Sequence, residues 1–232
     1  MTANFKETLP DTIQHIAERS EADGSYLVLM AVSGVLAAVA MLTDSVPVLI
    51  GSMIIAPALP PLTLISYAIV ARQPRMMLKG TVAALLGFGV AIAAALLTTV
   101  LLNATNVIPE ETNLLSKTLL TERVQPGWYS VITAVAAGIA GTIALNERKT
   151  DTLVGVVAAL ALVPAGAAAA IAFLSQDPTE GWGGLLLLAI NVVLIVVAGV
   201  ATLLFIRLAE RVQTTSQIKS QTTLQKKENF YE

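Results

Sequence analysis

The sequence has no cysteine among its 232 residues and only one histidine, His15. Without cysteine there is no disulfide framework, no thiolate metal site and no cysteine nucleophile. One histidine cannot supply the HExxH pattern of a metalloprotease, and no base is evident beside Ser52 or Ser66 to activate a serine nucleophile. We therefore expect no catalytic residue, no metal site and no cofactor.

Charged residues are also scarce. They make up 13% of the chain, the net charge is −2, and no long basic run marks a surface for nucleic acid. Hydrophobic residues make up 55% of the chain, and the mean hydropathy is +0.75. This composition excludes an ordinary soluble domain and predicts an integral membrane protein, with the lipid bilayer as its surroundings.

Six apolar stretches without charge have about the 17 to 25 residues that a helix needs to cross a bilayer. They run over residues 26–42, 46–71, 80–102, 128–145, 152–174 and 183–206. The predicted fold is therefore all-α and polytopic, with six transmembrane helices.

The basic residues between these stretches predict the orientation. With both termini inside the cell, only Lys117 and Arg123 of the 14 Lys and Arg residues lie outside, as the positive-inside rule prefers. We expect a cytoplasmic N-terminal segment over residues 1–25, a transmembrane domain over 26–206 and a cytoplasmic C-terminal tail over 207–232.

The long external segment, residues 103–127, has a pattern of its own. Its leucines recur at helical spacing after acidic residues, at Leu114, Leu115, Leu119 and Leu120. This pattern predicts a short amphipathic helix on the outer surface.

The chain resembles itself when it is shifted by 104 residues, which lays residues 34–102 over 138–206. Five glycines or prolines then coincide: Gly34 with Gly138, Gly51 with Gly155, Pro60 with Pro164, Pro74 with Pro178 and Gly80 with Gly184. Only about one such coincidence is expected by chance. Each copy holds three spans, so the second must enter the bilayer from the opposite side. The pattern predicts an inverted 3+3 repeat, with copies of about 26–102 and 128–206; the alternative is that small-residue membrane helices look alike.

Prolines interrupt the second and the fifth apolar stretch. Pro57, Pro60 and Pro61 remove backbone donors from the second, and Pro164 falls about halfway along the fifth. Backbone groups freed within a bilayer must be satisfied by protein or by trapped water. We expect both helices to break, and the symmetry to bring the breaks together near the midplane as a site. The alternative is that the prolines are kinks healed by neighbouring helices.

A substrate or permeation pathway is predicted from the small, proline and polar residues of these breaks and one polar residue of the sixth stretch: Gly51, Ser52, Pro57, Pro60, Pro61, Thr63, Gly155, Pro164, Gly166 and Asn191. Asn191 overlays Gly87 under the shift, and could line the pathway or bond a neighbouring helix. Asp44 could cap the helix that begins near Pro47 or stand at the outer mouth. Ionisable residues are missing from the interior of the stretches, which disfavours a proton relay.

Three segments carry a resemblance to a known family: "TDSVPVLIGSMIIAPALPPL", "LLTERVQPGWYSVITAVAAGIAGTIAL" and "TLVGVVAALALVPAG". Over roughly residues 30 to 175 the chain resembles the bacterial and archaeal membrane proteins catalogued as domain of unknown function 389. It departs from that pattern in having the single Pro164 where the family often has two prolines, and in missing the soluble N-terminal domain of longer members. The resemblance implies a prokaryotic cell membrane and no particular substrate.

Two functions follow as hypotheses. The first is a transporter or channel for a small solute or ion, with its site at the midplane between the two breaks. Six spans make a thin bundle, so we expect a homo-oligomer, most simply a two-fold dimer. The second is a membrane scaffold or sensor without transport activity that works through oligomerisation, its polar ends and tight helix packing.

Overall fold

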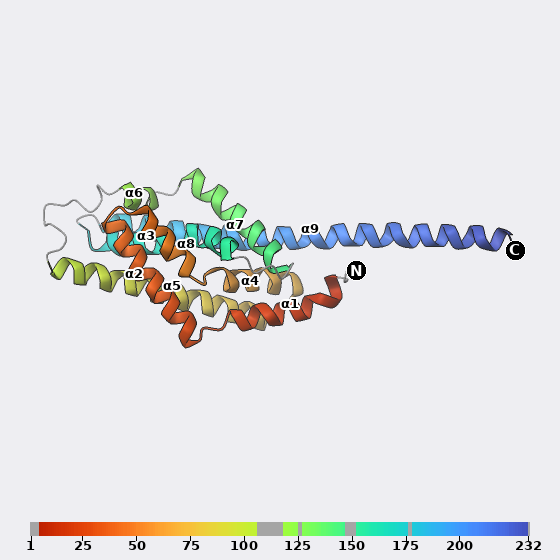
Figure 1. The fold of residues 1–232 in the computed structure, drawn as a ribbon, viewed down its shortest axis with the longest axis horizontal. Helices are drawn as coiled ribbons and strands as arrows, with labels where there is room; N and C mark the ends of the chain where they lie inside the picture. The colour runs from red at the N-terminus through yellow and green to blue at the C-terminus, as the bar shows by residue number, and fades with distance from the viewer. Residues whose placement is uncertain (1–4, 106–117, 125–126, 147–151, 176–177, 232) are drawn as a thin grey trace.

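The structure is a computed structural model that describes residues 5–105, 118–124, 127–146, 152–175 and 178–231. Every regular element within these ranges is an α-helix (Figure 1). The helices are α1 (Phe5–Arg19), α2 (Gly24–Leu42), α3 (Val46–Ile55), α4 (Leu59–Ala71), α5 (Pro74–Ala104), α6 (Thr118–Val124), α7 (Trp128–Asn146), α8 (Thr152–Phe173) and α9 (Thr179–Tyr231). The all-helical fold predicted from the sequence is thus confirmed.

Four described helices are long and apolar enough to cross a membrane: α2, α5, α7 as far as Leu145, and the Thr179–Ala209 part of α9. The pair α3 and α4 is a fifth candidate if it is counted as one bent span. In α8, the part described with its side chains, Leu162–Phe173, is apolar but shorter. These helices are compatible with a multi-pass membrane protein.

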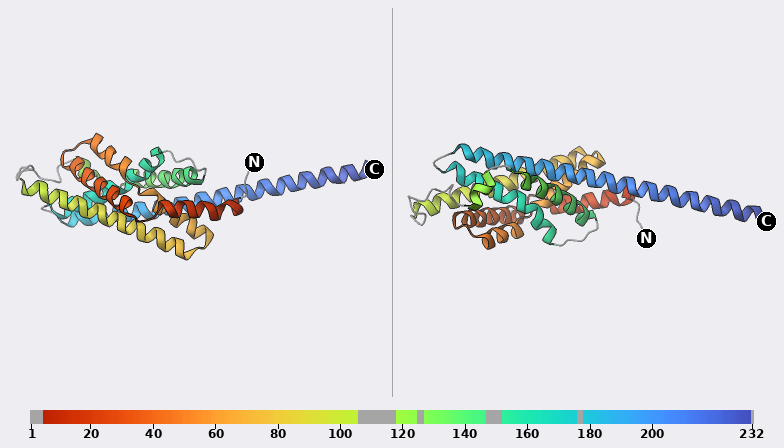
Figure 2. Two further views of the ribbon diagram at one scale, coloured as in Figure 1. Left: turned by 60° about the horizontal axis from the view of Figure 1, so that its bottom comes forward. Right: turned by 90° about the horizontal axis from the view of Figure 1, so that it is seen from above.

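The chain runs back and forth along the long axis of the bundle (Figures 1 and 2). Helix α1 and the projecting part of α9 lie at one end, and α6 lies at the other (Figure 1). The last helix does not stop where its apolar part ends at Ala209, but continues to Tyr231. The predicted C-terminal tail is therefore a continuation of α9, the helix of the last apolar stretch.

Two turns have the same hydrogen-bond pattern although neither contains glycine. After α2, the N–H of Ser45 donates to the carbonyl of Ala40 at 2.8 Å. After α4, the N–H of Gln73 donates to the carbonyl of Ala68 at 2.9 Å. The residue before each donor is left-handed, with φ of 53° at Asp44 and 56° at Arg72. Both are Schellman-type helix ends, in which aspartate tolerates the left-handed conformation better than most residues do.

The role predicted for Asp44 as the cap of α3 is wrong. Ser45 is the N-cap of α3, and it makes no capping bond through its side chain. The Asp44 carboxylate instead accepts a hydrogen bond from the backbone N–H of Leu119 at 3.1 Å. Because Asp44 is the left-handed residue that ends α2, its side chain points to the first turn of α6 rather than to α3.

Helix α6 is the described part of the predicted external amphipathic segment, whose residues 106–117 and 125–126 lie outside the described ranges. Leu120 is buried, and α6 packs against α8 and α9. The predicted short helix therefore exists between residues 118 and 124 and has one apolar side against the bundle.

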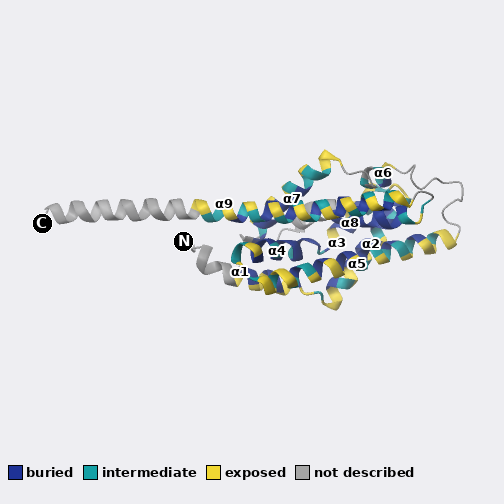
Figure 3. Cartoon of the chain, turned by 180° about the vertical axis from the view of Figure 1, so that it is seen from behind, coloured by how far each residue is buried: buried dark blue, intermediate teal, exposed yellow. Residues whose placement is uncertain are grey.

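Helix α8 lies in the centre of the bundle and is not broken. Pro164 lies inside it, and all residues from Leu162 to Ala172 are buried (Figure 3). The prediction that the fifth span breaks at Pro164 is wrong. A single proline removes one hydrogen bond, here to the carbonyl of Leu160, and neighbouring helices on every side hold the rest of α8 in place.

Glycines let pairs of helices approach closely at positions 104 residues apart. Gly34 of α2 lies against the main chain of Ala91 in α5, and Gly138 of α7 lies against the main chain of Ile195 in α9. A Cβ atom at either glycine would overlap the facing backbone. In the same way Gly80 of α5 lies against Ile65, and Gly184 of α9 lies against Ala169. The first and second halves of the bundle thus share two helix contacts in the same register.

Candidate functional site

The second apolar stretch is broken between α3 and α4, and we call residues Ala56 to Ala58 the α3–α4 break. Helix α3 ends at Ile55, Ala56 is extended with φ −69° and ψ 116°, and α4 begins at Leu59. The two helices are bent by 50°. The predicted break of the second span is therefore confirmed at this position.

The prolines leave the break with more backbone acceptors than donors. In an α-helix each N–H bonds the carbonyl four residues earlier. Pro57, Pro60 and Pro61 have no N–H, so the carbonyls of Met53, Ala56 and Pro57 lose their helical donors. Pro60 and Pro61 also occupy the first turn of α4, where free N–H groups would otherwise point outward. Main-chain chemistry at the break therefore favours a positively charged or donating ligand over an anion.

Hydroxyl groups near the break bond to other carbonyls. Ser33 of α2 donates to the carbonyl of Ser52 at 2.8 Å, and the Ser52 hydroxyl donates to the carbonyl of Leu49 at 2.7 Å. Thr63 donates to the carbonyl of Leu59 at 3.0 Å. All three side chains are buried. The Ser33 bond joins α2 to α3, whereas the other two bonds stay within α3 and α4. None of the three hydroxyl groups donates to a carbonyl that the prolines release.

The break and α8 belong to one buried core. Ala56, Ala58 and Leu59 share a hydrophobic cluster with Leu162 and Val163 of α8. Pro61 and Pro164 are buried, and Pro57 and Pro60 are half-buried. The predicted site residues of the second and fifth stretches thus lie on elements that pack together, since α8 contacts both α3 and α4.

The predicted glycines have unlike surroundings. Gly51 is half-exposed with open space where a Cβ atom would lie, whereas a Cβ atom at Gly166 would come within 3.2 Å of Ile92. Gly155 lies in the part of α8 whose backbone alone is described. Gly51 therefore leaves a helix surface without a packing partner within the described part of this chain, whereas Gly166 is packed against α5.

Asn191 is buried in α9. It lines a cavity of about 190 Å³ together with Ser130 of α7 and Leu187 of α9. In the first half, the residues 104 positions earlier are Gly87, Tyr26 and Ala83. There the Tyr26 ring packs on Gly87, and its hydroxyl donates to the carbonyl of Ala83 at 3.0 Å. The cavity beside Asn191 thus occupies the place that a tyrosine fills in the first half.

A second polar contact joins three helices. The Ser66 hydroxyl of α4 donates to the carbonyl of Val196 in α9 at 3.2 Å. A Cβ atom at Gly199 would lie 2.7 Å from the Ser66 hydroxyl oxygen and 2.9 Å from that of Thr142 in α7. Sequence reasoning did not single out Thr142, because a lone threonine in an Ala- and Gly-rich helix gives no signal of its own.

Side chains fill the space at the break in this structure. Met53, Ala58, Leu59 and Leu62 are each at most 6% exposed. A cavity beside Asn191 and a cavity beside Lys79 are both lined by residues other than those of the break. The described conformation is therefore closed at the break.

Comparison of the sequence with known proteins shows the family to which the chain belongs. The family described as a domain of unknown function (DUF389) matches residues 53–197, which include the α3–α4 break, Pro164 and Asn191. The uncharacterized protein MJ0678 of Methanocaldococcus jannaschii is 26% identical over 193 residues, which cover 82% of this chain and 56% of the relative. The chain thus spans about half the length of the curated relative it matches. No solved structure matches. With its apolar helices this chain is a membrane protein of unknown function, and it belongs to the DUF389 family.

Proposed function

We propose that this protein is a transporter or channel for a small solute or ion, and that its site at the α3–α4 break takes a cation. The observation that carries the proposal is the excess of backbone acceptors at the break. Pro57, Pro60 and Pro61 release carbonyls from helical bonds and contribute no N–H. Ion pathways in membranes use such carbonyls, at interrupted helices, in place of charged side chains.

The dipoles of the two half-helices support the same ligand class. The C-terminal end of α3 carries partial negative charge at the break. The N-terminal end of α4 would attract anions through its free N–H groups, but Pro60 and Pro61 remove two of them. Pro164 adds a further released carbonyl, that of Leu160, within α8. Together these groups favour a cation over an anion.

We further propose six membrane spans in an inverted 3+3 repeat. The paired contacts of Gly34 and Gly138, and of Gly80 and Gly184, support the repeat, because each pair has partners that are also 104 residues apart. Helix α1 and the projecting part of α9 lie at the same end of the bundle, which supports an even number of membrane crossings (Figure 1). Alternating access in this class of fold comes from movement of one repeat against the other, which would open the closed break.

The orientation and assembly of the chain belong to the same proposal. Arg72 ends α4, and Arg75 and Lys79 lie in the first turns of α5, on the side of α1. The positive-inside rule favours this side, with both termini, in the cytoplasm of a prokaryotic cell. A bundle this thin would be stabilised by a second copy, which favours a homodimer.

A scaffold or sensor is the second candidate, and α9 favours it. This helix continues from the end of its apolar span at Ala209 to Tyr231, outside the bundle (Figure 1). Most of the stability of helices in proteins comes from packing against other elements, so the projection could dock another protein. Such a protein needs no open state at the break.

Flux through liposomes tests the first proposal. Purified protein in liposomes should conduct at least one small monovalent or divalent cation, and the double variant P57A/P60A, which restores two backbone donors, should lower that flux about tenfold or more. Pro47→Ala is the matched control, because Pro47 lies in the first turn of α3 away from the break, and it should keep normal flux.

Three results would contradict the proposal in different ways. Anion flux without cation flux would contradict the cation assignment and leave a pathway. Cation flux that is equal in wild type and P57A/P60A would place the pathway elsewhere. Absence of all flux from folded protein would leave the scaffold as the better account.

A further inference from the structure

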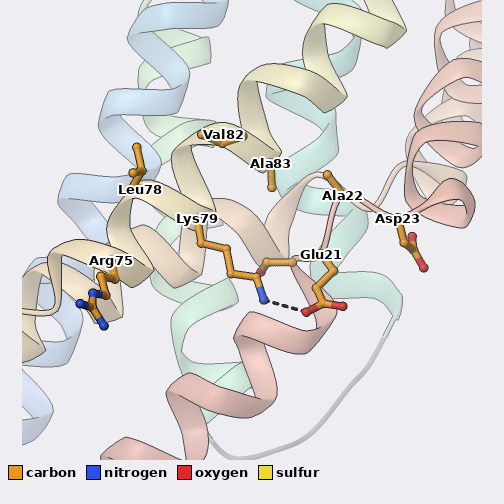
Figure 4. A pocket seen from close by; sticks show the side chains of 9 residues that line it. Glu21, Ala22, Asp23, Arg75, Leu78, Lys79, Val82 and Ala83 are labelled. Carbon is orange, nitrogen blue, oxygen red and sulfur yellow. Dashed lines mark hydrogen bonds and ion pairs between the residues drawn. The ribbon is translucent and has the colours of Figure 1, made fainter.

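A cavity of about 510 Å³ lies between the linker that joins α1 to α2 and the first turns of α5. Figure 4 shows four charged side chains along it, with Arg75 at one end, Lys79 and Glu21 in the middle and Asp23 at the other end. Lys79 Nζ and Glu21 Oε1 are 2.8 Å apart. The Asp23 carboxylate accepts a hydrogen bond from the N–H of Tyr26 at 2.7 Å, as the N-cap of α2. The cavity therefore has a cationic end and an anionic end.

We expect this cavity to lie at the depth of lipid headgroups. Helix α5 has 31 residues, about 46 Å at 1.5 Å per residue, which exceeds the roughly 30 Å of the bilayer hydrocarbon. Arg75 and Lys79 are the two charged residues of α5, so we expect its first turns to be the part that projects into the headgroup layer. The ion pair of Lys79 with Glu21 brings the start of α2 to the same level.

An apolar surface leads away from the cavity along α5. Leu78, which lines the cavity, is 64% exposed, Val82 is 45% exposed and Leu85 is 68% exposed. These residues are four and three positions apart, so they form one column on the helix surface. An acyl chain could follow this column while its headgroup occupies the cavity.

We propose that this cavity binds the phosphoethanolamine headgroup of a membrane lipid. Arg75 and Lys79 would donate to the phosphate, and Glu21 and Asp23 would accept from the primary ammonium. The charges of these four side chains cancel, which suits a zwitterion better than a net anionic headgroup. Aromatic side chains, which bind quaternary ammonium groups, are absent from the described lining, so phosphocholine fits less well.

Native mass spectrometry of the purified protein tests the proposal. The protein in detergent is mixed with equal amounts of phosphatidylethanolamine, phosphatidylcholine and phosphatidylglycerol that carry the same acyl chains. We expect the ethanolamine lipid to be retained preferentially. Equal retention of the ethanolamine and choline lipids would overturn the proposal in favour of unspecific lipid contact, and preferential retention of phosphatidylglycerol would replace it with an anionic-lipid site.

Two variants separate the cationic and the anionic end. Arg75→Gln should weaken retention of the ethanolamine and glycerol lipids alike, by about fivefold, as expected for one exposed charged contact. Asp23→Asn keeps an efficient N-cap for α2 but loses the negative charge. It should lower retention of the ethanolamine lipid by a similar factor and raise that of the glycerol lipid.

Arg19→Gln is the control, because Arg19 is an exposed cation at the end of α1 that does not line the cavity. It should leave all three lipids at wild-type retention. An unchanged ratio of ethanolamine to glycerol lipid in Asp23→Asn, with the variant folded by its thermal unfolding, would overturn the proposal.

Discussion

The two halves of the bundle share helix contacts but differ where a helix is interrupted. In the first half the apolar stretch breaks into α3 and α4 at Ala56 to Ala58, whereas in the second half α8 runs through Pro164 without a break. The number of prolines accounts for the difference. One proline releases one carbonyl, which neighbours can satisfy, whereas the prolines at 57, 60 and 61 remove three helical donors within five residues. Of these two apolar stretches, only that of the first half therefore has an interrupted helix, whose released backbone groups a function could use.

The halves also differ in how they fill equivalent space. Tyr26 packs on Gly87 in the first half, whereas Ser130 and Asn191 stand at the equivalent positions and leave a cavity of about 190 Å³ in the second. Ser33, which bonds the carbonyl of Ser52 near the break, has Ala137 as its equivalent. The hydroxyl group that bonds α3 near the break therefore has no counterpart at the equivalent position of the second half.

The largest expected effect comes from removing the tyrosine ring. Tyr26→Ala should lower the free energy of unfolding in detergent by about 3 to 4 kcal/mol, because it opens a cavity over Gly87 and loses the bond to Ala83. Tyr26→Phe keeps the ring and should cost only about 1 kcal/mol. Equal losses in the two variants would contradict a packing role for the ring.

A smaller loss is expected at the shared glycine contacts. Gly34→Ala and Gly138→Ala should each cost about 2 kcal/mol, because the added methyl group forces two helices apart. Gly89→Ala is the control, since open space surrounds Gly89, and it should be neutral or stabilising by up to about 1 kcal/mol. A large loss at Gly34 with none at Gly138 would argue against equivalent contacts in the two halves.

The smallest stability effect sharpens the contrast around the break. Ser33→Ala gives the first half the residue of the second and should cost about 1 to 2 kcal/mol, because the buried carbonyl of Ser52 loses a donor. Thermal unfolding of this variant and of Thr98→Ala distinguishes a hydroxyl that bonds another helix from one that bonds its own helix. Thr98 bonds only a carbonyl of its own helix at 2.7 Å, and its replacement should cost less than about 0.5 kcal/mol. Similar losses in both variants would remove the special role of Ser33.

The sequence predicted the helices better than their interruptions. Apolar stretches without charge predicted six spans, and four described helices, or five if α3 and α4 count as one bent span, are long and apolar enough to cross a bilayer. Proline spacing located the α3–α4 break, but the same rule failed at Pro164, where the burial of α8 on every side decides the outcome. Packing of this kind depends on distant segments and leaves no mark near the proline itself.

The candidate site was predictable only in part, for the same reason. Ser52, Thr63 and the prolines lie at or beside the break as expected, whereas Asn191 lies at a separate cavity. The partner of Asp44 is Leu119, 75 residues away in the sequence, and the contact of Ser66 and Thr142 over Gly199 joins three helices. Local patterns cannot specify such contacts, because they depend on how the helices assemble.

Water access to the break tests the central claim most directly, and the absence of cysteine makes the measurement clean. Thr63 and Ala167 are equivalent under the 104-residue shift, and both are buried. Single cysteines at these positions should differ towards a membrane-impermeant thiol reagent added to protein in liposomes. Our account predicts that Thr63→Cys reacts when the break opens and that Ala167→Cys, in the unbroken α8, stays unmodified. If Thr63→Cys remained as unreactive as Ala167→Cys in folded protein, the break would not be part of a solute pathway.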